Sequence, residues 1–131
     1  MSDGLARWHA YMQAPSAEDL RAMLAEKAVF HSPVVHTPQE GRDKVFAYLH
    51  AADSVFGGSG FRYVREIVDG DQAMLEFTAE IDGIHINGVD IIRWNADGLI
   101  GDFKVMVRPL KAIDKLRELM GAELERAQKS A

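Results

Sequence analysis

The clearest hydrophobic pattern lies in the second half of the chain, where apolar and polar side chains alternate over residues 73–82, with Met74 as the one apolar side chain at a polar position. A period of two predicts a strand with one buried and one solvated face. Residues 61–68, 84–94 and 99–107 are also rich in β-branched and aromatic side chains, and turn sequences with glycine separate all these runs. An antiparallel meander is therefore predicted. An isolated glycine often marks a bulge, so we expect one at Asn87-Gly88.

The first half of the chain has the spacing of helices. Leu5, Trp8 and Met12 recur at helical intervals, and Ser16 can cap a short second helix over residues 17–24. Residues 42–56 carry the apolar stripe of a third helix. Between the second and third helices, residues 28–32 form a short β-prone run that stops at a proline. After the strands, Pro109 suits the first turn of a closing helix.

Helices and strands occupy separate parts of the chain, which predicts an α+β fold rather than a parallel α/β sheet. The 131 residues and 14.6 kDa correspond to one domain over residues 1–131, with residues 109–129 as a C-terminal helical extension. The apolar stripe of that extension must be buried. It can lie over the open end of the domain or against a partner subunit, and the sequence leaves both open.

Composition excludes several classes of function. The chain has no cysteine, so it has no disulfide, thiolate metal site or cysteine nucleophile. A formal net charge of −5 argues against nucleic-acid binding through an overall basic field. No apolar run approaches the roughly 20 residues of a membrane span, and the N-terminus lacks the pattern of a signal peptide. We expect a cytoplasmic protein that binds neither nucleic acid nor membrane.

Short motifs in a fixed order connect the chain to a known family. They lie in residues 7–11, in residues 30–34 followed by Gly41, and in residues 88–100. In sequence and order they resemble the nuclear transport factor 2-like superfamily, and within it the SnoaL-like polyketide cyclases and ketosteroid-isomerase-like proteins. The resemblance covers roughly residues 5–110. It implies a strongly curved, antiparallel-rich sheet wrapped against three N-terminal helices as a cone, with a deep apolar pocket. It also implies a homodimer packed through the outer face of the sheet.

The resemblance also implies roles for particular positions. Asp90 matches the aspartic acid that donates a hydrogen bond in the oxyanion hole of ketosteroid-isomerase-like enzymes. Their oxyanion-hole tyrosine falls at or near Trp8, with Tyr11 one turn later. Where they carry a general-base aspartate before a proline, this chain has Ser32. One of the three functional positions is therefore retained.

Asp90 is the strongest candidate for a chemical role. It lies in an apolar strand, and an inward orientation would put it on one face with Ile92 and Trp94. Desolvation would then raise its pKa and make it a hydrogen-bond donor or general acid. The alternative is an outward carboxylate paired with a basic side chain on a neighbouring strand. The alternation of this strand leaves both open.

Two histidines, His31 and His36, bracket the loop after the first strand. Either one can replace the missing base, because histidine titrates near neutral pH and the resemblance implies that this loop lies at the mouth of the pocket. The alternative for each is a solvated or backbone-bonded histidine. A metal site formed by His31, His36 and His85 is conceivable, but the spacing of these residues matches no zinc signature. We therefore expect no metal and no cofactor. The predicted ligand-binding residues are Trp8, Tyr11, Met12, Ser32, His36, Ile92, Trp94 and Met106.

These observations favour a pocket protein for a small apolar oxygenated compound. One hypothesis is an acid/base enzyme of isomerase, cyclase or dehydratase type, with Asp90 as acid and His31 as base. The others are a non-catalytic ligand-binding domain and a dimerisation module, because a fold alone does not determine a function.

Overall fold

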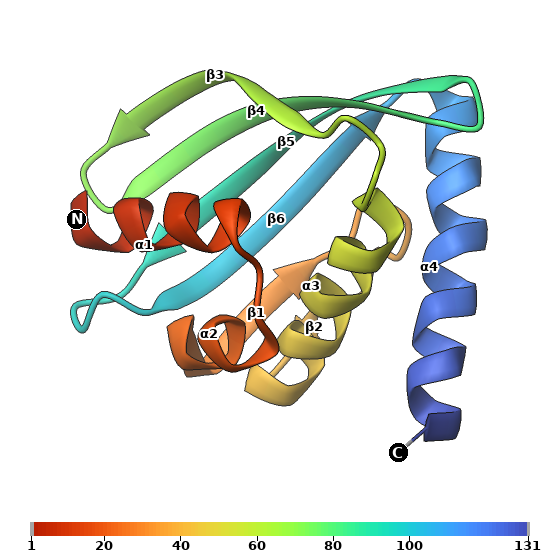
Figure 1. Cartoon of the computed structure of the whole chain (residues 1–131). Coiled ribbons are helices and arrows are strands. Elements are labelled where there is room, and N and C mark those ends of the chain that lie inside the picture. The colour runs from red at the N-terminus through yellow and green to blue at the C-terminus, as the bar shows by residue number, and fades with distance from the viewer. Residues whose placement is uncertain (1, 131) are drawn as a thin grey trace.

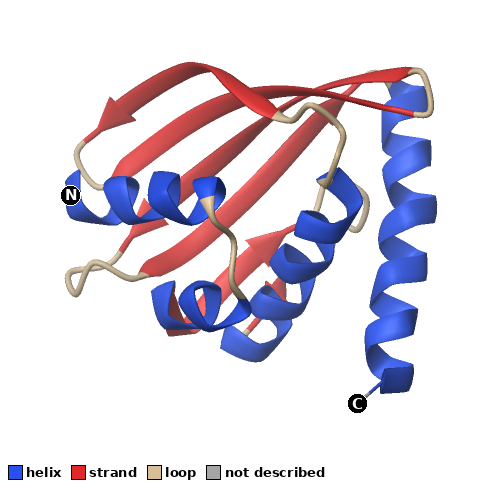
Figure 2. Ribbon diagram, viewed as in Figure 1, coloured by secondary structure: helices blue, strands red, loops and turns tan. Residues whose placement is uncertain are grey.

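One curved, open sheet of six strands forms the framework of the protein (Figures 1 and 2). The computed structural model describes the backbone of residues 2–130 and the side chains of residues 3–128. The elements in chain order are α1 (Ser2–Gln13), α2 (Ala17–Met23), β1 (Leu24–His31), β2 (Gln39–Glu40), α3 (Arg42–Phe56), β3 (Arg62–Asp69), β4 (Gln72–Ile81), β5 (Ile84–Trp94), β6 (Ile100–Arg108) and α4 (Leu110–Ser130). The strand order is β2-β1-β6-β5-β4-β3. All neighbours are antiparallel except β1 and β6, so the predicted α+β class with an antiparallel-rich sheet is confirmed.

The central hairpin, β4 with β5, follows the predicted pattern closely. Its pairing runs without a shift to the end at Ile81 and Ile84, and the turn between them has positive φ at both Asp82 (53°) and Gly83 (78°). Such a turn matches the right-handed twist of the strands. The predicted bulge at Gly88 is wrong, because the register with β4 is continuous there. Gly88 instead makes room for an aromatic ring opposite it on β4.

The junction between α2 and β1 differs from the prediction. β1 begins at Leu24, directly after α2 ends at Met23, whereas the sequence predicted a strand from residue 28. Leu24, Ala25 and Ala28 are all buried, so this segment carries no alternation by which a strand could be recognised. β2 has only two residues and was not predicted. It pairs with β1 and forms the edge of the sheet beside it.

The helices α1, α2 and α3 cover one face of the sheet (Figure 1). Ser16 caps α2 as predicted, because its Oγ accepts a hydrogen bond from the backbone N–H of Asp19 at 3.1 Å. Buried residues such as Leu20 and Val45, both 0% exposed, form the main core between these helices and the sheet. α4 stands beside α3 and buries Ala112 and Leu116 (Figure 1). Within residues 2–130, no helix is long and apolar enough to cross a membrane.

Candidate functional site

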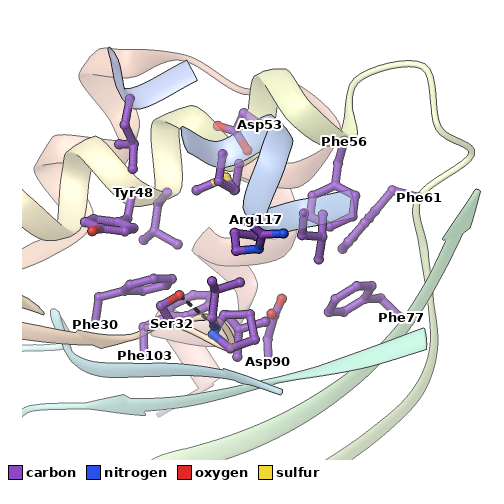
Figure 3. A pocket seen from close by; sticks show the side chains of 18 of the residues that line it. Phe30, Ser32, Tyr48, Asp53, Phe56, Phe61, Phe77, Asp90, Phe103 and Arg117 are labelled. Atoms are coloured by element: carbon purple, nitrogen blue, oxygen red, sulfur yellow. Dashed lines mark hydrogen bonds between the residues drawn. The ribbon is translucent and has the colours of Figure 1, made fainter. Parts of the chain in front are cut away.

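A cavity of about 450 Å³ lies between the sheet and α3, and α4 borders it (Figure 3). Its volume and apolar character are those of a site for a small organic molecule. The fold builds it from the inward positions of the strands, which supply the aromatic walls. The phenylalanines that line it are Phe30, Phe56, Phe61, Phe77 and Phe103.

Asp90 points into this cavity from β5 (Figure 3) and is only 6% exposed. The hydroxyl of Tyr63 on β3 donates a hydrogen bond to Asp90 Oδ2 at 2.5 Å. Trp8 Nε1 on α1 in turn donates to the Tyr63 oxygen at 3.0 Å. This chain of hydrogen bonds links a helix and two strands, and it orients the buried carboxyl group.

Burial raises the pKa of Asp90 from 3.8 to about 7, although the hydrogen bond from Tyr63 acts in the opposite direction. Burial also raises the pKa of Tyr63, and the neighbouring Asp90 carboxyl adds to that shift. Near neutral pH a large share of Asp90 is therefore protonated, and Tyr63 is neutral. A neutral carboxyl group has an O–H to donate, which an ionised aspartate lacks.

A second carboxyl group, Asp53, lines the cavity from α3 (Figure 3). The hydroxyl of Tyr11 on α1 donates a hydrogen bond to Asp53 Oδ2. Burial raises the pKa of Asp53 from 3.8 to about 7. The sequence reasoning missed both Asp53 and Tyr63. Each had a recognisable pattern: Asp53 follows the buried Leu49 by one helical turn, and Tyr63 shares a strand face with the inward Phe61.

The predicted site residues divide into two groups, and the first group lies at the cavity or directly behind it. Trp8, Met12, Ser32 and Asp90 line the cavity, and Tyr11 contacts it through Asp53. Asp90 also shares the inward face of β5 with Ile92 and Trp94, as the sequence predicts for an inward orientation. Those two residues, Ile92 (0% exposed) and Trp94 (3% exposed), belong to the main core and do not line the cavity.

The second group lies away from the cavity. His31, His36 and Met106 border a second hollow, which meets the cavity at Ser32. Because Phe30 takes the inward position on β1, the next residue, His31, points the opposite way, and its Nε2 lies 2.9 Å from Asp102 Oδ1. This corrects the expectation that His31 and Asp90 meet in one cavity.

The Ser32 hydroxyl is already used within its own loop. Its Oγ accepts hydrogen bonds from the backbone N–H groups of Val34 (3.0 Å) and Val35 (3.2 Å). Ser32 therefore holds the loop at the edge of the cavity in shape, and it contributes no ionisable group where the related enzymes carry a base.

The conceivable histidine metal site does not assemble. His85 pairs with Glu80 on the hairpin, whereas His31 pairs with Asp102. Across the part of the chain that the structure describes, no three histidine or carboxylate side chains are grouped closely enough to hold a metal ion.

The sequence allows the apolar stripe of α4 to lie either over the open end of the domain or against a partner subunit. In the structure its stripe borders the cavity through Leu116, Met120 and Leu124. Arg117, on the same helix, brings a positive charge to the cavity (Figure 3).

A curved, open sheet that encloses an apolar cavity against helices defines an α+β pocket fold. Residues 5–103 match the model of the SnoaL-like domain, so the chain belongs to the SnoaL-like family of the nuclear transport factor 2-like superfamily. This confirms the family indicated by the sequence motifs. Among curated proteins, no match to the chain was found.

Solved structures resemble the chain over most of its length. A steroid delta-isomerase from Pseudomonas aeruginosa is 34% identical, with a TM-score of 0.84 over 98% of this chain and 91% of that protein. An uncharacterized bacterial protein with a cystatin-like fold, from Silicibacter pomeroyi, is 36% identical, with a TM-score of 0.83 over 91% of this chain and 83% of that protein. An NTF2-like protein from Mesorhizobium loti, 23% identical with a TM-score of 0.70 over 82% and 90% of the two chains, shares the fold.

Proposed function

We propose that the protein is an acid–base enzyme that isomerises a small, largely apolar carbonyl compound, and that Asp90 donates a hydrogen bond to the carbonyl oxygen. The observation that carries the proposal is a buried carboxyl group, bonded to Tyr63, that points into an apolar cavity.

The chemistry of the cavity supports this role for Asp90. When a proton leaves the carbon beside a carbonyl group, negative charge develops on the carbonyl oxygen. A fixed donor in a dry site stabilises that charge far more than water-exposed groups do. Tyr63 occupies Oδ2 of Asp90, so Oδ1 is the atom that carries the acid proton toward a bound substrate. The indole N–H of Trp8 fixes Tyr63 in turn.

The similarity to a steroid delta-isomerase from Pseudomonas aeruginosa, at 34% identity, supports a substrate with a fused-ring apolar skeleton and a movable double bond. A cavity of about 450 Å³ is within the range of sites for molecules of that size. A β,γ-unsaturated 3-ketosteroid is therefore the first probe to use.

With this probe, the wild-type protein is expected to form the conjugated enone, which is followed by its ultraviolet absorbance. Asp90→Ala is expected to lower kcat/KM by roughly 10²–10³-fold, because an oxyanion donor is lost. Asp102→Ala, which removes a carboxylate outside the cavity, is the matched control and should keep wild-type turnover. Wild-type turnover by Asp90→Ala would contradict the proposal.

A non-catalytic ligand-binding protein is the second candidate, and the engaged hydroxyl of Ser32 favours it, because the loop offers no base there. It predicts that the same steroid binds without conversion and that Asp90→Ala weakens the binding.

We also propose a homodimer formed through the outer face of the sheet. Three exposed apolar side chains gather in one hollow there: Ile67 (57% exposed), Met74 (41%) and Met106 (49%). Pairing with a second copy would remove them from water. Sedimentation at micromolar concentration should give the mass of a dimer, and a clean monomer would contradict this.

A further inference from the structure

We propose that Asp53 is a catalytic residue of this site: its carboxylate takes a proton from a substrate carbon and returns it to another, and Tyr11 positions it. The inference rests on the proposed acid–base function and deepens it, because it assigns the base that neither Ser32 nor His31 supplies.

The first argument is the choice of bases in the cavity. Among the described residues that line it there is no histidine and no lysine, and the carboxyl groups are Asp53 and Asp90 alone. Asp90 accepts a hydrogen bond from the Tyr63 hydroxyl, and the proposed function assigns its own proton to the carbonyl oxygen of the substrate. Asp53 is therefore the group left to accept a proton from a bound molecule.

The second argument is the geometry of the two carboxyl groups. Asp53 projects from the helical wall on α3, and Asp90 projects from the sheet wall on β5, so a guest between them meets both (Figure 3). The carboxyl of Asp53 also contributes to the raised pKa of Tyr63, after the effects of burial and of Asp90. A substrate whose carbonyl oxygen binds Asp90 would thus present its neighbouring carbons toward the opposite wall.

The third argument is that the two carboxyl groups differ in exposure, although burial raises the pKa of both to about 7. Asp90 is only 6% exposed, whereas Asp53 is partly exposed. Partial hydration favours a carboxylate, and deeper burial favours the neutral acid. The hydroxyl that Tyr11 donates to Asp53 Oδ2 stabilises the carboxylate there, as the Tyr63 hydroxyl does at Asp90, so exposure is what distinguishes the two groups. Asp53 suits the base and Asp90 suits the acid.

The step balances without any further reactant. The Asp53 carboxylate removes a proton from the carbon between the carbonyl group and the double bond. The C–H electron pair becomes part of a dienolate, whose oxygen accepts the hydrogen bond from Asp90. Asp53 then delivers the same proton to the far end of the diene, and the carbonyl group re-forms. The double bond is now conjugated, and both carboxyl groups have returned to their starting states.

Titratable and charged groups on five elements lie at the cavity wall or contact the two carboxyl groups. They are Tyr11 from α1, Tyr48 from α3, Tyr63 from β3, Asp90 from β5 and Arg117 from α4. Burial raises the pKa of Asp53 to about 7, so the base gains activity as pH rises through neutrality. Loss of the Tyr11 hydroxyl removes a donor to the carboxylate, and this loss should move the acid limb of the kcat profile to higher pH.

The experiment compares Asp53→Asn and Tyr11→Phe with wild type, using the β,γ-unsaturated 3-ketosteroid for turnover and its conjugated product for binding by calorimetry. Asp53→Asn is expected to lower kcat by roughly 10²–10⁴-fold and to change the Kd of the product by less than about threefold. Tyr11→Phe should shift the acid limb upward. Asp43→Asn, at the exposed start of the same helix, is the matched control and should behave as wild type.

The outcomes separate the two proposals. If wild type and Asp90→Ala behave as expected but Asp53→Asn keeps wild-type kcat, the assignment of Asp53 is overturned and the proposed function stands. An unshifted acid limb in Tyr11→Phe overturns the positioning role of Tyr11. If wild type converts none of the probe, the proposed function and the base assignment fail together. A normal thermal unfolding transition for Asp53→Asn shows that lost turnover is not lost folding.

Discussion

Asp90→Asn is expected to remove a large part of the pH dependence of stability. In the unfolded chain this carboxyl group has a pKa of 3.8, and in the folded protein burial raises it to about 7. Between these values the folded state holds a proton that the unfolded state has released, so the free energy of unfolding falls as pH rises. This decrease in the free energy of unfolding is complete above pH 7 and amounts to about 4 kcal/mol for a pKa shift of this size.

Urea unfolding at several pH values between 4 and 8 measures this effect. The free energy of unfolding of Asp90→Asn should fall less over that range than that of wild type, by up to about 4 kcal/mol. The amide has nearly the same shape and can still accept the hydrogen bond from Tyr63. Asp71→Asn, at an exposed turn, is the control and should follow wild type. Parallel curves for wild type and Asp90→Asn would contradict a buried carboxyl with a raised pKa.

Phe77→Ala is expected to lower the free energy of unfolding by about 3–5 kcal/mol, because it empties a large, fully buried position. Phe77 is 1% exposed and packs on Phe61 at 4.7 Å and on Phe56 at 5.7 Å between ring centroids. It also fills the space above Gly88, where an added Cβ would lie 2.4 Å from the ring. One side chain thus joins the sheet to α3 and forms part of the cavity wall.

Urea unfolding at one pH compares Phe77→Ala with Phe77→Leu, which keeps most of the volume and should lose less stability. A loss below about 1 kcal/mol for the alanine variant would mean that this wall of the cavity carries little of the stability.

Much of the fold follows from local patterns. The alternation along β4, the turn at Asp82-Gly83 and the stripe of α3 all predict elements that the structure contains. The region around Leu24 could not be predicted in the same way, because apolar residues stand on both faces of the chain where α2 passes into β1. A strand of two residues such as β2 has no period to detect.

The site was less accessible to sequence reasoning, since its geometry depends on contacts between distant segments. Tyr63 meets Asp90 across 27 positions, and Tyr11 meets Asp53 across 42 positions. Asp90 could be recognised because a lone acid in an apolar strand is unusual, but its direction depends on which face of β5 is inward. The prediction that His31 lies in the cavity was wrong for the same reason. Adjacent residues of a strand point to opposite faces, so Phe30 faces the cavity and His31 faces away from it.

A measurement of the pKa of Asp90 tests most directly whether this carboxyl group is a protonated acid in the apolar cavity. Carbon-13 NMR of the aspartate carboxyl carbons, titrated from pH 3 to 9, would report it, with Asp90→Asn identifying the resonance. We predict a midpoint near 7. A midpoint near the 3.8 of an ordinary aspartate would mean that the group is ionised at neutral pH, which contradicts the proposed donor.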